Sequence, residues 1–463
     1  MRHRIAQAAV AALALFVCAL AVQSAAVAAP HIVVRTPRAW QVCQRDARGR
    51  ADIVVRGRCV DLGGRVRVSW GGYRTTARCD RTGRFTAVLE DVPGGQATLH
   101  VRSARSPRVV CSRRDVGVGD IYVIAGQSNA SGRSVDLFSY SSQKLRAAMF
   151  GNDYRWQELH DPVDSPAGQV DTVSLDRIAG GSVWPDVATD LLAGEGVPVA
   201  FVPCARSSTP ITFWRPDLPA RRPAGTLYTS MARRIAAVGG RVRAVLWWQG
   251  ERDARFLTPG PRYEAALRTL ASTLWRDFRT PLVVAQIGDY GIAYTDAGVD
   301  VVRLAQEKAW REPHILQGPV LYDIDLHGQV HFVEPDDVSA AAHRWAAAIL
   351  RSVLHHDAGR TPRLSLAVRE GDEVVLTADS PLAPGADLGG FVVRDAGRQV
   401  VIASASCDGD TIRLLLGEPA EGSLDVSLGE GRSAAGAAVP TDTSAWRLPM
   451  LPFVERPVVT ATP

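Results

Sequence analysis

The stretch Ile121-Tyr122-Val123-Ile124-Ala125-Gly126-Gln127-Ser128-Asn129-Ala130-Ser131-Gly132 indicates how this chain folds. Its apolar start predicts a buried strand that stops at a glycine, and a serine follows two residues later. That serine would stand on the turn at the carboxyl end of the strand. A hydroxyl placed there is exposed, and its backbone N–H can point at the same reacting atom. A Gly-x-Ser turn alone is common and is not the G-x-S-x-G elbow, so other clusters have to decide its role.

The residues around this stretch predict an α/β domain over residues 118–355. Apolar strands at 199–202, 244–246 and 282–284 alternate with helical stretches. This alternation predicts a mostly parallel sheet between helices, with ligands bound beyond the carboxyl ends of the strands. The clearest helix follows Pro261, and its apolar face is formed by Tyr263, Leu267, Leu270, Leu274 and Phe278.

Short β-type segments flank this domain on both sides. At 463 residues the chain is long enough for two to four domains of roughly 100–200 residues. Alternating segments separated by glycine-rich turns predict β-sandwich-like domains over residues 30–117 and 356–463.

The first 28 residues have the pattern of a secretory signal peptide. A basic start is followed by an apolar run from Ala8 to Val22 and by Ala26-Val27-Ala28. The run is shorter than the ~20 residues that a spanning helix needs. We expect a secreted or periplasmic protein without a membrane span.

The number and spacing of the cysteines are consistent with an exported protein. Removal of the leader takes Cys18 away and leaves four cysteines close together and two far apart. A cluster of four in an exported domain favours two disulfides, and all three connectivities stay open. The sequence has no C-x-x-C pair, so a zinc site is not favoured. The clustered residues are Cys43, Cys59, Cys79 and Cys111.

Composition excludes several classes of protein. Hydrophobic residues make up 46% and charged residues 22%, as in soluble globular proteins, which excludes a disordered, collagen-like or multi-span chain. The formal net charge of +5 is small for this length. Nucleic-acid binding, which needs a concentrated basic stripe, is therefore not expected.

Two further clusters carry polar chemistry at strand ends. The segment Leu246-Trp247-Trp248-Gln249-Gly250-Glu251-Arg252-Asp253-Ala254 again ends an apolar strand in a polar turn. Gln249 could donate its amide to an oxyanion, while Glu251 and Asp253 could orient the loop or a substrate hydroxyl. The segment from Asp323 to Phe332 places His331 near the last predicted strand, where a general base would face Ser128.

Together these clusters resemble the sialate O-acetylesterases and related carbohydrate acetylesterases of the SGNH hydrolase superfamily. The resemblance covers most of the chain. It rests on Gly126-Gln127-Ser128-Asn129, Trp248-Gln249-Gly250-Glu251-x-Asp253-Ala254, His331-Phe332, Trp40-Gln41-Val42-x-Gln44-Arg45, Gly94-Gly95, Val116-x-x-Gly119-Asp120-Ile121-Tyr122 and Leu448-Pro449-x-x-Pro452-Phe453.

The resemblance implies a serine esterase that acts on O-acetylated sugars. Ser128 would be the nucleophile, and His331 the general base and then the general acid. The oxyanion hole would use the Ser128 N–H, the Gly181 N–H and the Gln249 amide. Such a mechanism needs no metal and no organic cofactor.

The sequence departs from this pattern at the supporting acid. The family places it three residues before the histidine, where this chain has Gly328. Asp325, or less favourably Asp323, could reach His331; a backbone carbonyl could serve a Ser–His dyad; or the protein could be weakly active.

A second departure lies in the loop Cys204-Ala205-Arg206-Ser207-Ser208-Thr209-Pro210. The family tends to have glycines where the two serines stand. Arg206 could meet a substrate carboxylate and Trp214 could line the sugar site, although Arg206 could equally be a solvated loop residue.

Three functions therefore compete. The leading hypothesis is an exported carbohydrate O-acetylesterase, with sialic acid as the substrate implied by the resemblance. An acetylxylan or other polysaccharide esterase is the second. A non-catalytic glycan-binding protein on a degenerate esterase scaffold is the third.

Overall fold

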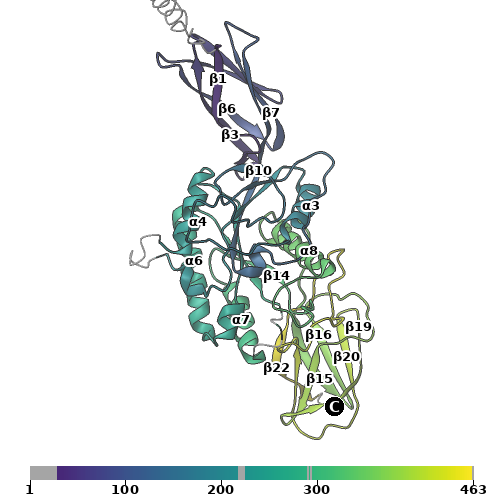
Figure 1. The fold of residues 1–463 in the computed structure, drawn as a ribbon. Coiled ribbons are helices and arrows are strands. Elements are labelled where there is room, and N and C mark those ends of the chain that lie inside the picture. Colours follow the sequence, from purple (N-terminus) through teal and green to yellow (C-terminus); the bar gives the residue numbers. More distant parts are fainter. Residues whose placement is uncertain (1–28, 217–224, 289–290, 292–294, 461–463) are drawn as a thin grey trace, which may run out of the picture.

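The computed structural model describes residues 29–216, 225–288, 291 and 295–460 (Figure 1). The predicted signal peptide at residues 1–28 lies outside the described residues. Three separate hydrophobic clusters follow one another along the chain. No described helix is long and apolar enough to cross a membrane.

The N-terminal region is built from two antiparallel sheets that enclose one hydrophobic cluster. Strand residues alternate between buried and exposed, which gives each sheet one apolar face and one solvated face. One sheet contains β1 (His31–Thr36), β3 (Arg50–Val60) and β6 (Arg84–Pro93); the other contains β4 (Arg65–Trp70), β5 (Tyr73–Arg78), β7 (Gly95–Ser103) and the start of β8 (Val110–Gly126), with β2 (Val42–Gln44) alongside.

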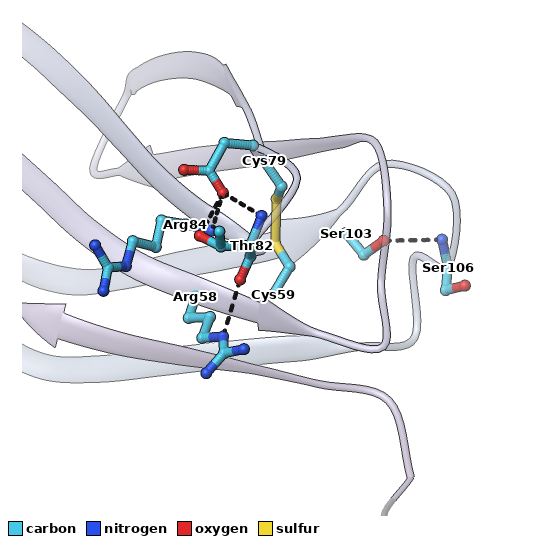
Figure 2. Close-up of a disulfide and its surroundings, with 8 residues drawn as sticks. Arg58, Cys59, Cys79, Thr82, Arg84, Ser103 and Ser106 are labelled. Carbon is cyan, nitrogen blue, oxygen red and sulfur yellow. Dashed lines mark hydrogen bonds between the residues drawn. A yellow bond between two sulfur atoms is a disulfide. The ribbon is translucent and has the colours of Figure 1, made fainter.

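One disulfide forms in this region, between Cys59 of β3 and Cys79, which follows β5 (Figure 2). Cys43 and Cys111 are free thiols, so the expected pair of disulfides is corrected to one. Cys43 pairs with Val118 in the β2–β8 ladder. Cys111 lies seven positions earlier on β8, roughly 23 Å away along an extended strand, which is far beyond disulfide reach.

Strand β8 joins this region to the α/β region. Its 17 residues run without interruption from Val110 to Gly126, and its second half is fully buried. The domain boundary predicted between residues 117 and 118 therefore falls within one continuous strand.

The α/β region is organised around that second half of β8. The strands follow the order β10-β9-β11-β8-β12-β13-β14, and the pairs from β9 to β14 are parallel. These strands are β9 (Ala148–Phe150), β10 (Trp156–Glu158), β11 (Val199–Pro203), β12 (Ala244–Trp248), β13 (Leu282–Gln286) and β14 (Ile315–Val320). Because β10 pairs antiparallel with β9, and β7 pairs antiparallel with β8, the sheet is mixed, and the predicted mostly parallel sheet describes only its central part.

Helices cover both sides of this sheet (Figure 1). On one side lie α4 (Leu227–Ala237), α6 (Gly260–Phe278) and α7 (Asp296–Ala309), and on the other α3 (Trp184–Glu195) and α8 (Pro335–Ser352). The helix predicted after Pro261 is α6, and Tyr263, Leu267 and Leu274 on its apolar face are fully buried. Three short elements complete the region: α2 (Ser128–Ser131), η1 (Ile211–Trp214) and α5 (Glu251–Arg255).

The C-terminal region also consists of two sheets around a common cluster. Val320 and Tyr322 from the α/β region belong to that cluster, so the two regions share packing. One sheet contains β15 (Leu364–Glu370), β16 (Glu373–Ala378), β19 (Ile402–Asp408), β20 (Thr411–Leu416) and β23 (Val459–Thr460); the other contains β17 (Phe391–Asp395), β18 (Arg398–Val400), β21 (Leu424–Leu428) and β22 (Phe453–Pro457).

Candidate active site

Ser128 stands where the sequence predicts it, on the turn at the carboxyl end of β8. Gly126 ends the strand at φ 136°, and a Cβ there would come within 2.0 Å of Trp248 O on β12. Only glycine allows this close approach of two strands. Ser128 then begins the short helix α2, whose first N–H groups have no acceptor within the helix. The Ser128 N–H can therefore donate to an anion beside its own hydroxyl.

Gly181 also lies beside this turn, but it is not a free oxyanion donor. Its N–H donates to Ser134 O at 2.9 Å in a β-bridge. The neighbouring Ser182 N–H donates to Asp161 at 2.9 Å, and the Gly180 N–H to Gly132 O at 3.2 Å. The expectation for Gly181 is corrected, because the N–H groups of this segment already have acceptors.

The oxyanion role expected for Gln249 is corrected for the same reason. Its side-chain nitrogen donates to Asp253 Oδ2 at 2.7 Å and to Thr209 O at 3.1 Å, and the residue is fully buried. Tyr263 and Gln306 bond to the Gln249 backbone carbonyl. The residue fixes the turn after β12 from within the protein.

Glu251 and Asp253 are buried and orient loops, so their expected contact with substrate is corrected. Glu251 Oε1 accepts from the side chain of Asn129, next to the candidate nucleophile, at 2.9 Å. Burial raises the pKa of Glu251. Asp253 Oδ2 accepts from the Ile211 N–H at 2.8 Å, and its Oδ1 accepts from Thr258 at 2.8 Å. Asp253 thereby ties η1 to α5.

Arg206 is near the serine turn, whereas Trp214 is in the core. The Arg206 N–H donates to Gly126 O at 3.0 Å, and its guanidinium donates to Val173 O at 2.7 Å. Arg206 helps to line a cavity of about 280 Å³, together with Val173, Thr212, Phe213, Arg215, Gly225, Thr226 and Leu227. Trp214 is completely buried and packs edge-on against Trp247, 5.1 Å between ring centroids, so its expected contact with sugar is corrected.

The segment around His331 is attached to the serine turn at two points. Ser134 Oγ donates to Val333 O at 2.9 Å. Phe332 packs against Trp248, 5.4 Å between ring centroids, and Trp248 O accepts the Gln127 N–H. The two clusters, about 200 residues apart in sequence, therefore meet at one edge of the sheet. Among the described residues, no hydrogen bond joins Ser128 Oγ to the imidazole, and such bonds often form only when substrate binds.

His331 is half-buried beside a cation. Burial and, to a smaller extent, the positive charge of Arg133 lower its pKa to about 4, and the negative charge of Asp176 opposes both effects. Arg133 and Asp176 form an ion pair, and Asp176 Oδ2 also accepts the Ser207 N–H at 2.8 Å. At neutral pH the imidazole is uncharged, as a general base has to be.

Asp325 does not support His331. Its Oδ1 accepts the His327 N–H at 2.7 Å, and its Oδ2 lies 3.4 Å from His327 Nδ1. Both oxygens of Asp323 are bonded to Arg344, at 2.5 and 2.7 Å. The expectation that Asp325 is the acid of a triad is corrected, because Asp325 is bonded to His327.

Among the described residues, no carboxylate is hydrogen-bonded to His331. A Cβ on Gly328 would meet nothing within 4 Å, so this position is open space. Within the described ranges, His331 has no hydrogen bond to a carboxylate. The arrangement is that of a Ser–His pair without a bonded acid.

The sequence reasoning missed Arg133 and Asp176. Arg133 follows the serine turn directly, and its place next to that motif is the available signal. Asp176 lies in an irregular stretch between β10 and α3, and only the fold brings it to His331.

Part of the chain is similar to known carbohydrate esterases. Residues 118–340 match the family described as "Carbohydrate esterase, sialic acid-specific acetylesterase". The match covers most of the α/β region and slightly less than half of the chain. The match supports an ester hydrolase of the carbohydrate esterase class.

Two relatives illustrate the extent of the likeness. A probable carbohydrate esterase of Arabidopsis thaliana is 26% identical over 204 residues, which are 40% of this chain and 74% of that protein. The crystal structure of a carbohydrate acetylesterase from Xanthomonas citri superposes with a TM-score of 0.61 at 21% identity, over 92% of this chain and 99% of the other. At this identity the second likeness concerns the fold.

Proposed function

We propose that this chain is an exported carbohydrate O-acetylesterase that works through a Ser128–His331 pair and an acetyl-enzyme. The observation that carries the proposal is the Ser134–Val333 hydrogen bond of 2.9 Å, because it attaches the histidine segment to the serine turn. The leader pattern at residues 1–28 and the Cys59–Cys79 disulfide support export, since disulfides persist in oxidising compartments.

The reaction follows from these residues. Neutral His331 takes the proton of Ser128 Oγ as the oxygen attacks the acetyl carbonyl carbon. The negative charge that develops on the carbonyl oxygen is met by the Ser128 N–H. Collapse breaks the ester C–O bond, and the sugar oxygen leaves with the proton from His331. Water then attacks the acetyl-enzyme, with His331 again as base, and acetate and free Ser128 are released.

O-acetylated sialic acid is our first choice of substrate. Arg206, whose backbone N–H bonds to Gly126 O, lines a cavity together with Arg215 and Phe213. Guanidinium groups suit a sugar carboxylate, and an aromatic face suits a sugar ring or an acyl group. Acetylxylan, which carries fewer carboxylates, is the second candidate.

A non-catalytic glycan-binding protein is the competing function, and the observation in its favour is the missing carboxylate at His331. Loss of the acid of a serine protease triad lowers turnover by about 10⁴. A backbone carbonyl that holds the same tautomer would recover part of that loss.

One experiment separates these functions. Acetate release is measured from p-nitrophenyl acetate, O-acetylated sialic acid and acetylxylan, with the parent protein and with Ser128→Ala. We expect the variant to lose at least about 10³-fold in kcat. Equal rates for both proteins would rule out the esterase mechanism in favour of glycan binding. The ratio of rates on the two sugars tests the substrate.

A further inference from the structure

The small net charge of the chain conceals a strong asymmetry. Residues 31–117 contain 18 arginines and 7 acidic residues, a net charge of +11. Residues 118–463 contain 33 basic and 41 acidic residues, a net charge of −8. Basic charge is therefore concentrated in the N-terminal region.

Five of these 18 arginines lie on one sheet face. On β4 and β5, Arg65 stands directly opposite Arg78, and on β4 and β7, Arg67 stands directly opposite Arg102. Arg74 of β5 points to the same side, because it follows the same alternation and is exposed. We call Arg65, Arg67, Arg74, Arg78 and Arg102 the arginine face.

The arginine face is not neutralised by the protein. Strands β4, β5 and β7 contain no aspartate or glutamate. Within the described residues, no ion pair involves a member of the face; Arg102 donates to Pro107 O. Elsewhere in the region, by contrast, Arg48 and Arg50 pair with Asp91.

Like charges directly opposite each other destabilise a sheet. The arginine face has two such pairs, at Cβ separations of about 5 Å. The opposite sheet has one such pair, Arg58 opposite Arg84, so the repulsion is more concentrated on the arginine face. A ligand with closely spaced negative charges would relieve the repulsion.

The ligand has to be a polymer if it is also to reach the active site. Val110, at the start of β8, pairs with Arg102 of the face, whereas Gly126, at the other end, adjoins Ser128. A 17-residue strand spans roughly 50 Å, so one sugar unit cannot contact both places.

We propose that the arginine face binds an anionic polysaccharide whose charges are carboxylates, and so holds the esterase on a polymer. Guanidinium groups bind carboxylates with two parallel hydrogen bonds, which favours arginine over lysine. The strands of the face expose threonine, serine and histidine between the arginines. Single-stranded nucleic acid would need exposed aromatic rings for base stacking, and a broad sheet does not enter a duplex groove as a two-stranded ribbon does.

The test measures binding of the full chain to polygalacturonate by affinity electrophoresis in a native gel, with dextran as the neutral polymer. The variant carries Arg65→Gln, Arg67→Gln, Arg74→Gln and Arg78→Gln. We expect it to bind polygalacturonate at least about tenfold more weakly, with no change for dextran. Its kcat/KM on p-nitrophenyl acetate should equal that of the parent, because the face is remote from Ser128.

A matched control removes the same charge from the opposite sheet, which also exposes arginines. It carries Arg35→Gln, Arg56→Gln, Arg58→Gln and Arg84→Gln, and we expect its affinity for polygalacturonate to stay within about threefold of the parent. Equal weakening in both variants would overturn the proposal, because net charge alone would explain it. Binding of duplex DNA or anionic lipid vesicles without binding of polygalacturonate would also overturn it. Since binding is read without catalysis, failure here leaves the esterase proposal untouched.

Discussion

The serine turn and the histidine segment meet at one sheet edge, yet they are held very differently. Gln127, Asn129 and Gln249 around the serine turn are buried and bonded to buried partners. In the histidine segment, His327 is exposed and bonded to two carboxylates, whereas His331 is bonded to neither of these carboxylates. The comparison shows that a hydrogen-bond network fixes the turn of the candidate nucleophile, whereas the segment of the candidate base is attached through Ser134 and Phe332.

Of the substitutions considered, replacement of His331 should have the largest effect, and replacement of His327 serves as its control. His331→Ala should lower kcat on p-nitrophenyl acetate by roughly 10³-fold or more, because the base is lost. His327→Ala is the matched control, four residues away, and should leave kcat close to that of the parent. The reverse order of effects would make the carboxylate-bonded His327 the base.

The buried partner of the serine turn should matter for stability as well as activity. Glu251→Ala removes the acceptor of the Asn129 amide and should lower the free energy of unfolding by about 1–3 kcal/mol. Turnover should fall too, since Asn129 is next to Ser128. Urea unfolding checks the first effect, and Glu421→Ala, at an exposed glutamate, is the control. A loss no larger than in the control would show that the network does not hold the turn.

The pH dependence tests the charges at His331. Because its pKa is lowered to about 4, the imidazole stays neutral down to that pH, and kcat/KM should fall only below it. Arg133→Gln removes a positive charge, which raises the pKa and moves this acid limb to higher pH. Asp176→Asn removes a negative charge and should move the limb to lower pH. Limbs at the same pH in both variants would mean that this ion pair does not act on the base.

The smallest effect is expected at Asp325. Asp325→Asn should leave kcat within about twofold, because its carboxylate is bonded to His327 and not to the base. A fall near the 10⁴-fold typical of a lost triad acid would restore the triad and refute the pair.

The local sequence pattern predicted the strand ends well. Runs of apolar residues and the glycines that end them are features of a few neighbouring residues. The apolar run before Gly126, the amphipathic helix after Pro261 and the β-type segments at both ends all appear where they were expected. The expected number of disulfides and the roles expected for Gly181, Gln249 and Trp214 were wrong. These depend on which partner an N–H, an amide or a ring meets, and that partner is distant in sequence.

The sequence by itself determined the candidate reacting groups, since the proposed mechanism uses the hydroxyl of Ser128 and the imidazole of His331. It also determined the uneven distribution of charge, because the basic and acidic residues of each region can be counted from the sequence. Only the tertiary structure decided which carboxylate bonds which histidine, which donors remain free, and that the arginines share one face. The physical reason is that hydrogen bonds and electrostatic interactions depend on distances of a few ångströms between residues that only the fold brings together.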